Sequence, residues 1–405
     1  MHCDLNGFYA SVECLFRPEL REVPMAVCGS VEDRHGIILA KNELAKAYGV
    51  TTAETVWQAQ RKCPGLVLVP PRHGEYSRYS RIVNAIYERY TDMVEPFGID
   101  ESWLDVTASL HLFGTGEQIA NQLREVVRRE VGLTISVGVS FGKVFAKLGS
   151  DLKKPDATTV VSRENFREIV HPLPVSCLLY AGKTTTKALE RLGISTVGQL
   201  AACSREALAA QMGKMGEALH DYACGIDESP VAVYGQLEPP KSVGNGMTFS
   251  RNLVGAEDVR AGVAALSDKV ASRLRRCGMK CGAVQVTIRD PSFKTIQRQR
   301  RLSAPTHQTR EIAEAALSII AASWREGAPI RMLTVTGINL TAGGEEQLSL
   351  FGEESTAHRR RDKLEQAVDT IRDRYGRDAI SLASVFREDI GLRPVKKRGG
   401  EDEDE

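Results

Sequence analysis

The sequence lacks a long hydrophobic run. None of its apolar stretches reaches the roughly 18 residues that a membrane-spanning helix needs, and the N-terminus has no basic segment followed by an apolar one. We therefore expect no membrane contact and a cytoplasmic location. At 405 residues, of which 42% are hydrophobic, the chain is nevertheless long enough for several domains, each with its own core.

Closely paired cysteines are also scarce. The nine cysteines are scattered, and the closest pair, Cys277 and Cys281, has no second pair that could complete a zinc site. The spacing indicates no disulfide framework either, so we expect the thiols to be reduced and structural.

The chain as a whole has almost no net charge, but parts of it are strongly charged. The net charge is only +1, yet residues 241–340 contain 16 Lys and Arg against 7 Asp and Glu, and residues 401–405 are all acidic. A basic block of this kind is typical of a surface that binds a polyanion. Taken alone, it more often forms a solvated charged face.

Two adjacent carboxylates, Asp100 and Glu101, interrupt the apolar stretch from Pro96 to Thr107. The alternation around Leu104 predicts a half-buried strand, with the carboxylates at the tip of a β-hairpin. Two like charges at a sheet edge repel each other unless a cation lies between them, and Mg²⁺ prefers carboxylate oxygens. A plain solvated turn is the alternative, and it is the commoner one for an isolated pair.

A third carboxylate, Asp4, lies in a short apolar strand at the N-terminus. A strand aspartate followed about a hundred residues later by an Asp-Glu pair is the layout of a palm domain. Further motifs follow in order: AKNELAKAYGV, SVGVSFGKVFAKLGSDLKKPD, PLPVSCLLYAGKTTTKALERLG, KSVGNGMTFSRNL and EQLSLF. Together they resemble the Y-family DNA polymerases of the DinB type, over roughly Met1 to Phe351.

The resemblance implies an α+β fold shaped like a right hand. We expect a ferredoxin-like palm, small fingers, a helical thumb with a helix-hairpin-helix, and a little finger made of an antiparallel sheet plus two helices. The expected bounds are 1–9 and 72–162 for the palm, 10–71 for the fingers, 163–230 for the thumb, 231–241 for a linker, 242–342 for the little finger and 343–405 for a tail.

The resemblance also implies the chemistry of the palm. Two Mg²⁺ ions are expected, with Asp4 and Asp100 as shared ligands, the backbone carbonyl of Leu5 completing one shell, and Glu101 nearest the attacking 3′-hydroxyl. Asn6 stands where many relatives have a second aspartate, which we treat as a minor departure.

A deoxynucleoside triphosphate is the substrate that the resemblance implies. Tyr9 corresponds to the family's steric gate and Phe8 is expected beneath the sugar, while Lys41, Lys46 and Lys154 are expected at the phosphates. The fingers motif departs from the family, because Glu43 replaces a phosphate-contacting tyrosine and Ala40 a hydroxyl residue. Lysine also lacks the bidentate geometry of the arginine found in relatives at position 46.

Primer-template DNA is the expected macromolecular partner. A helix N-terminus in the thumb should bind a DNA phosphate without reading sequence, although a packed helical hairpin is the alternative. The little finger should add further contacts through one open face of its sheet. The predicted DNA-binding residues are Gly182, Lys183, Thr184, Thr185, Arg251, Arg289, Arg298 and Arg300.

A short peptide in polar, glycine-rich surroundings follows the little finger. Gln347, Leu348, Leu350 and Phe351 resemble the segment by which bacterial polymerases bind the sliding clamp. The whole pattern predicts a monomeric lesion-bypass polymerase of low fidelity without a proofreading exonuclease. A palm-fold nucleotide cyclase and a catalytically inactive DNA or clamp adaptor are the alternatives; the first needs no clamp peptide, and the second should have lost its carboxylates.

Overall fold

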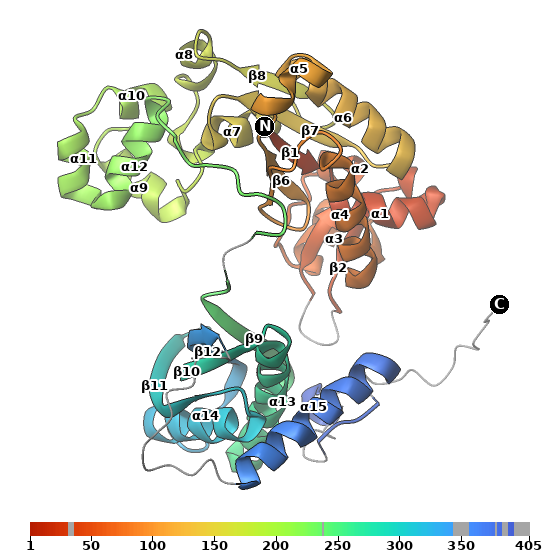
Figure 1. The fold of residues 1–405 in the computed structure, drawn as a ribbon, viewed down its shortest axis with the longest axis vertical. Coiled ribbons are helices and arrows are strands. Elements are labelled where there is room, and N and C mark those ends of the chain that lie inside the picture. The colour runs from red at the N-terminus through yellow and green to blue at the C-terminus, as the bar shows by residue number, and fades with distance from the viewer. Residues whose placement is uncertain (31–35, 237–238, 343–355, 377–378, 383–387, 393–405) are drawn as a thin grey trace. The chain divides into compact units, whose positions relative to one another are not determined.

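The computed structural model describes residues 1–30, 36–236, 239–342, 356–376, 379–382 and 388–392. The chain forms two compact units, the first comprising Met1–Gly29 and Ile37–Glu238, the second comprising Ser30–Gly36 and Pro239–Glu405 (Figure 1). Across the described residues, no helix is both long and apolar enough to cross a membrane. Each unit has its own buried apolar clusters, as the composition predicts.

A five-stranded sheet forms the centre of the first unit. Its order is β5-β6-β1-β7-β8, in which β1 pairs antiparallel with both neighbours and β7 pairs parallel with β8. The strands are β5 Val94–Pro96, β6 Glu101–Leu104, β1 His2–Leu5, β7 Ile135–Ser140 and β8 Thr158–Val161. The predicted hairpin is confirmed, since Pro96 pairs with Ser102 and the Asp-Glu pair lies at its turn.

The prediction of a half-buried strand at the hairpin is wrong. Ser102, Trp103 and Leu104 are all buried, because β6 lies inside the sheet and helices cover both of its faces. Trp103 donates its indole N–H to the Lys143 carbonyl of α7, whereas Leu104 packs in the cluster that includes Tyr87 of α4. The helices around the sheet are α1 Phe8–Phe16, α4 His73–Tyr87, α5 Leu110–Phe113, α6 Gly116–Val131 and α7 Lys143–Leu152, with the 3-10 helices η1 Pro18–Arg21 and η2 Thr107–Ser109.

Residues predicted as fingers contain a second, three-stranded sheet. Its order is β3-β2-β4, and two short helices enclose its apolar face. Thr55 begins one of these helices with a capping box, which satisfies the first free N–H groups. The elements are β2 Met25–Cys28, β3 Ile38–Lys41, α2 Glu43–Ala47, α3 Val56–Lys62 and β4 Val67–Val69.

The segment predicted as thumb is helical. Its helices are α8 Phe166–Val170, η3 Val175–Cys177, α9 Lys183–Arg191, α10 Val197–Ala201, α11 Arg205–Met212 and α12 Lys214–Ala223. The expected helix before the hairpin is only a single 3-10 turn, and the left-handed residue there is Tyr180 rather than Gly182. Gly182 is instead the extended residue that precedes α9.

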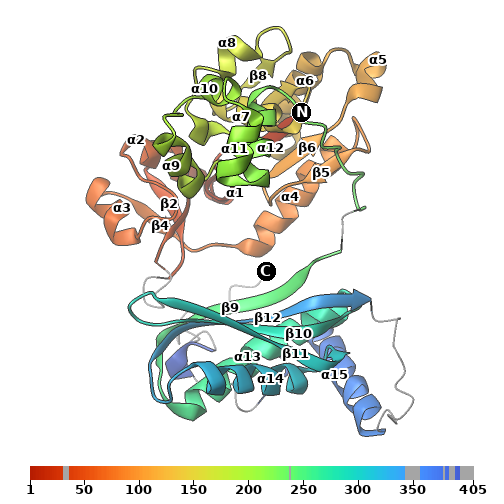
Figure 2. The same ribbon diagram turned by 90° about the vertical axis from the view of Figure 1, so that its left-hand side faces the viewer.

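A four-stranded antiparallel sheet with two helices forms most of the second unit. Its order is β11-β10-β12-β9, and Figure 2 shows α13 and α14 on the same face. Val284, Val286 and Ile288 are buried on that face, as their alternation predicts. The elements are β9 Ser242–Leu253, α13 Gly255–Arg276, β10 Met279–Arg289, β11 Thr295–Thr306, α14 Thr309–Ser323 and β12 Ile330–Ala342.

The C-terminal segment is part of this second unit. Helix α15, Thr356–Tyr375, bears Glu365 and Asp369, which pair with Arg275 of α13. The 3-10 helix η5, Glu388–Ile390, places Ile390 in the buried core. Residues that the sequence leaves without an assigned role therefore contribute to the packing of the little-finger sheet.

Candidate active site

Asp4 and Glu101 lie directly opposite each other on β1 and β6. Side chains of opposed residues in an antiparallel pair share a face, so both carboxylates point to the same side of the sheet. Two lysines reach them, one from the middle of α7 and one from the loop that follows this helix. Lys154 Nζ lies 2.6 Å from Asp4 Oδ2, and Lys147 Nζ lies 2.9 Å from Glu101 Oε1 and 3.7 Å from Asp4 Oδ2.

The two carboxylates differ in proton affinity. Burial raises the pKa of Asp4, and the neighbouring Lys154 lowers it only in part. Burial also raises the pKa of Glu101, but contacts with His2 and Lys147 outweigh this effect and bring that pKa below its usual range. The pair therefore titrates as a unit in which Asp4 holds a proton more strongly than Glu101 does.

Asp100 occupies the hairpin turn immediately before Glu101. Its backbone carbonyl accepts a hydrogen bond of 3.0 Å from the N–H of Leu5, which places Leu5 beside it. Burial raises the pKa of the Asp100 carboxyl, and the negative charge of Glu101 raises it further. The structure thus brings the four predicted metal-ligating residues, Asp4, Leu5, Asp100 and Glu101, to one edge of the sheet.

The donor set is chemically suited to a hard divalent ion. In the part of the chain that the structure describes, no three or more His, Cys, Asp or Glu side chains are arranged around a single metal position. Lys147 and Lys154 instead supply the positive charge beside Asp4 and Glu101. Carboxylate oxygens are the ligands that Mg²⁺ prefers, so the chemistry of these side chains suits the predicted ions, whereas in this structure the carboxylates of Asp4 and Glu101 are paired with lysines.

Two residues at the site were missed by the sequence analysis. His2 is fully buried, with Nε2 3.4 Å from Glu101 Oε2 and Nδ1 2.9 Å from Ser150 Oγ. Lys147 contacts both Asp4 and Glu101. The period of two places His2 on the same face as Asp4, and this was a signal that could have found it.

Tyr9 lies in an aromatic group beside the carboxylates. Its ring stacks on Tyr76 at 4.0 Å and meets His73 edge-on. Burial raises the pKa of Tyr9, and the charge of Asp100 adds to this. Phe8 is only 3% exposed and packs beneath these rings, so its side chain supports Tyr9 from the core.

The two fingers lysines lie differently from Lys154. Lys46 is half exposed and pairs with Glu43 at 3.1 Å, and Lys41 donates to Thr52 at 3.2 Å. Lys41 also lines a cavity of about 450 Å³ together with Gly7, Asp156 and other residues. Gly7 has φ +52°, and a Cβ there would lie 3.2 Å from the Lys41 carbonyl oxygen, so the turn after β1 favours glycine.

The predicted DNA-binding residues occupy several environments. Gly182, Lys183, Thr184 and Thr185 lie at the N-terminus of α9, where no side chain caps the helix. Arg251 contacts Asp258 and Asp389. The register pairs Arg298 and Arg300 with the buried residues Val286 and Val284, so both arginines lie on the helix-bearing face, opposite to Arg289. The clamp-peptide residues Gln347, Leu348, Leu350 and Phe351 lie outside the described residues.

Comparisons with known proteins identify the family of the chain. Residues 3–151 match the impB/mucB/samB family, and residues 240–350 match the C-terminal domain of the same family. DNA polymerase IV of Acetivibrio thermocellus is 48% identical over 98% of this chain and 99% of the relative. DNA polymerase IV 2 of Halalkalibacterium halodurans is 37% identical over 95% of this chain and 94% of the relative.

A solved structure shares the fold. The Y-family DNA polymerase chimera Dbh-Dpo4(243-245)-Dbh superimposes with a TM-score of 0.73 at 20% identity, covering 84% of this chain and 98% of the chimera. The chain belongs to the impB/mucB/samB family, and within it to the DinB type of Y-family DNA polymerases.

Proposed function

We propose that the chain is a template-directed DNA polymerase of the lesion-bypass type. It would extend a primer with deoxynucleoside triphosphates, using two Mg²⁺ ions and no proofreading exonuclease. One observation carries the proposal: Asp4 and Glu101 lie opposite each other on neighbouring strands beside Lys147 and Lys154, and Asp100 lies in the turn immediately before Glu101. Relatives named DNA polymerase IV that match nearly the whole chain support the same substrates here.

Different residues of the chain would bind the metal ions, lie beside the attacking hydroxyl and bind the triphosphate. Bound Mg²⁺ ions would neutralise charge that develops on the transferring phosphoryl group. Asp4, Asp100 and the Leu5 carbonyl would hold these ions, and Glu101 would lie nearest the attacking 3′-hydroxyl. Lys154 would bind the triphosphate, which brings negative charge to a lysine that already neutralises Asp4.

The remaining assignments follow the family pattern. We assign residues 1–9 and 72–162 to the palm, 10–71 to the fingers, 163–230 to the thumb and 242–342 to the little finger. Lys41 and Lys46 would contact the phosphates from the fingers, and the N-terminus of α9 would bind a DNA phosphate.

Primer extension on a templated duplex tests the proposal. Wild-type protein with Mg²⁺ should add the templated deoxynucleotide, and both a cyclase and an inactive adaptor should fail to do so. A cyclic nucleotide formed without template would favour the cyclase. DNA binding without extension under any divalent ion would favour the adaptor.

The proposed clamp partner has its own test. Deleting residues 347–351 should leave synthesis without clamp unchanged and abolish its stimulation by the sliding clamp, since buried apolar anchors dominate small interfaces. Unchanged clamp affinity of the deletion variant would remove this partner from the proposal.

A further inference from the structure

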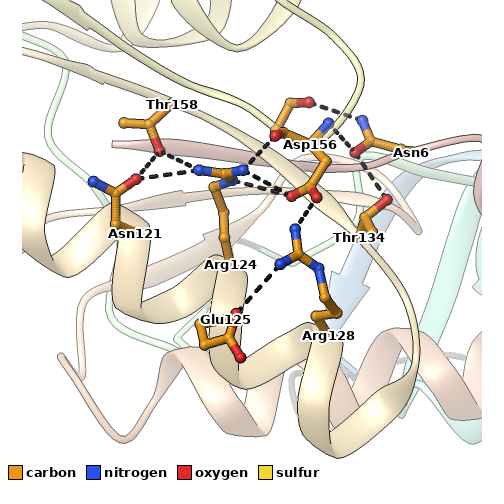
Figure 3. A network of polar contacts seen from close by, with 9 residues as sticks. Asn6, Asn121, Arg124, Glu125, Arg128, Thr134, Asp156 and Thr158 are labelled. Atoms are coloured by element: carbon orange, nitrogen blue, oxygen red, sulfur yellow. Dashed lines mark hydrogen bonds and ion pairs between the residues drawn. The ribbon is translucent and has the colours of Figure 1, made fainter.

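Asp156, two residues after Lys154, is held by all of its polar groups (Figure 3). Its N–H donates to Asn6 Oδ1 at 2.8 Å. Its backbone carbonyl accepts from the Arg124 guanidinium, and its carboxylate pairs with both Arg124, at 3.0 Å, and Arg128. The residue is thus bound between helix α6 on one side and the turn that follows strand β1 on the other.

The backbone of Asp156 requires this support. Its φ of +50° lies in the left-handed region, which residues other than glycine seldom adopt, although aspartate is among the more tolerant. Strain of this kind persists where surrounding contacts determine the conformation. On α6, Arg124 and Arg128 are four residues apart and therefore share the helix face that meets the loop.

The other anchor of the loop is Asn6, which adjoins the metal-ligating strand. Asn6 donates through Nδ2 to Ser136 and accepts through Oδ1 from Thr134 and Asp156. Its own carbonyl accepts from Ser11 at the start of α1. Through these hydrogen bonds the Asn6 side chain connects the loop to Thr134 and to Ser136 of β7 as well.

We propose that Arg124, Arg128, Asp156 and Asn6 form a positioning group that sets the place of Lys154 for the incoming triphosphate. The inference rests on the proposed function and adds to it. Lys154 lies between Asp4 and Asp151, each at 2.6 Å, and must keep its position when a nucleotide enters. The loop that follows Lys154 is fixed at Asp156. This limits the positions that the Nζ atom of Lys154 can occupy.

The effect of this group should appear in nucleotide binding rather than in folding. Arg124 is 21% exposed, Arg128 48% and Asp156 23%. Partly exposed ion pairs such as these contribute about 1 kcal/mol or less each to stability. A change of position at Lys154 acts on the triphosphate contact itself, so it should raise KM for the nucleotide and leave kcat nearly unchanged.

Single-nucleotide incorporation separates this role from a structural one. For Arg124→Gln, Arg128→Gln and Asp156→Gly we expect KM to rise about three- to tenfold, kcat to stay within about twofold and the melting temperature to fall by no more than about 4 °C. Asp156→Gly keeps the left-handed turn accessible while removing the carboxylate, so it isolates the ion pairs from the backbone conformation. Asp156→Asn keeps one acceptor oxygen, so its KM should lie between those of the wild type and Asp156→Gly.

The matched control is Arg129→Gln on the same helix. Arg129 is exposed, pairs with Glu130 and makes no contact with Asp156, so its KM should stay at the wild-type value. An unchanged KM in both Arg124→Gln and Asp156→Gly would overturn the inference. Equal rises in the control and in the test variants would do the same.

A double-mutant cycle decides whether the group acts through Lys154. In a Lys154→Ala background, Asp156→Gly should have no further effect on KM; additive effects would show that the two sites act separately. Equilibrium binding of a fluorescent deoxynucleoside triphosphate should change in parallel with KM. If the wild-type protein extended no primer, the proposed function would fail, and the binding measurement would still decide whether the group positions Lys154.

Discussion

The two units of the molecule contain contrasting groups of charged residues. In the first, the acids lie on central strands, and Lys147 and Lys154 reach them from α7 and the loop after it. In the second, Arg275 of α13 pairs with Glu365 and Asp369 of the C-terminal segment, and Arg372 of that segment pairs with Asp268 of α13.

The degree of burial distinguishes the ion pairs that can exchange partners from those that cannot. Lys154 is 28% exposed at the sheet edge, so an incoming phosphate or cation can replace its present contacts. Arg275 is only 7% exposed and also donates to the His307 carbonyl at 3.0 Å. The first arrangement suits a site that must accept a charged substrate, and the second suits a permanent connection between α13 and α15.

The largest expected effect concerns the carboxylate site of the first unit, where the contacts of Lys154 can be exchanged. Asp100→Ala should abolish primer extension, because it removes a predicted metal-ligating carboxylate and with it several kcal/mol of transition-state stabilisation, about 3 or more. DNA affinity, measured by fluorescence anisotropy, should stay close to wild type since binding is assigned to the thumb and little finger. Extension at a substantial fraction of the wild-type rate would end the assignment of the carboxylate edge as the catalytic centre.

The second effect concerns the buried pairing of Arg275 with Glu365 and Asp369, which connects α13 to α15. Arg275→Ala should destabilise the second unit by about 3 kcal/mol, because it leaves two partly buried carboxylates without their partner. Hydrogen exchange of the α13 amides reports this unit separately from the first. Arg276→Ala is the control: its pair with Asp373 is exposed, so the cost should stay within about 0.5 kcal/mol. Equal costs would mean that burial does not distinguish the pairs.

The sequence predicts much of this arrangement, but not how the charges are paired. Periodicity and turn residues identify β1, the β5–β6 hairpin and the α13–β10 region, because these signals are local. The prediction of a half-buried strand at Leu104 is wrong because helix α7, which covers the Trp103 side of this strand, lies far away in the sequence. Likewise, a basic count over residues 241–340 cannot reveal that Arg251 and Arg275 meet carboxylates more than 85 residues later.

The third effect is a change of selectivity at the catalytic edge. Tyr9→Ala should raise the ratio of ribonucleotide to deoxynucleotide incorporation at least about tenfold, since loss of a packed ring removes a steric barrier worth about 1.4 kcal/mol or more. Tyr9 is held by its stack on Tyr76, so Tyr9→Phe should keep the wild-type ratio. An unchanged ratio in matched single-nucleotide kinetics would assign the sugar check to another residue.

The smallest effect tests which arginines of the second unit contact DNA. On β10 and β11, Arg289 and Arg301 share the face opposite to α13 and α14, while Arg298 and Arg300 share the helix face. Arg300 also donates to Ser318 of α14, which holds it away from the open face.

If the open face binds the phosphate backbone, Arg289→Ala and Arg301→Ala should each lower the slope of log affinity against log salt by about 0.9, the value for one phosphate contact. Arg300→Ala should change the slope by much less, although the sequence predicts Arg298 and Arg300 as DNA-binding residues. Anisotropy titrations of a primer-template at several salt concentrations measure all of these slopes. A loss at Arg300 as large as that at Arg301 would show that DNA follows the exposed edge strand β11 rather than the open face of the sheet.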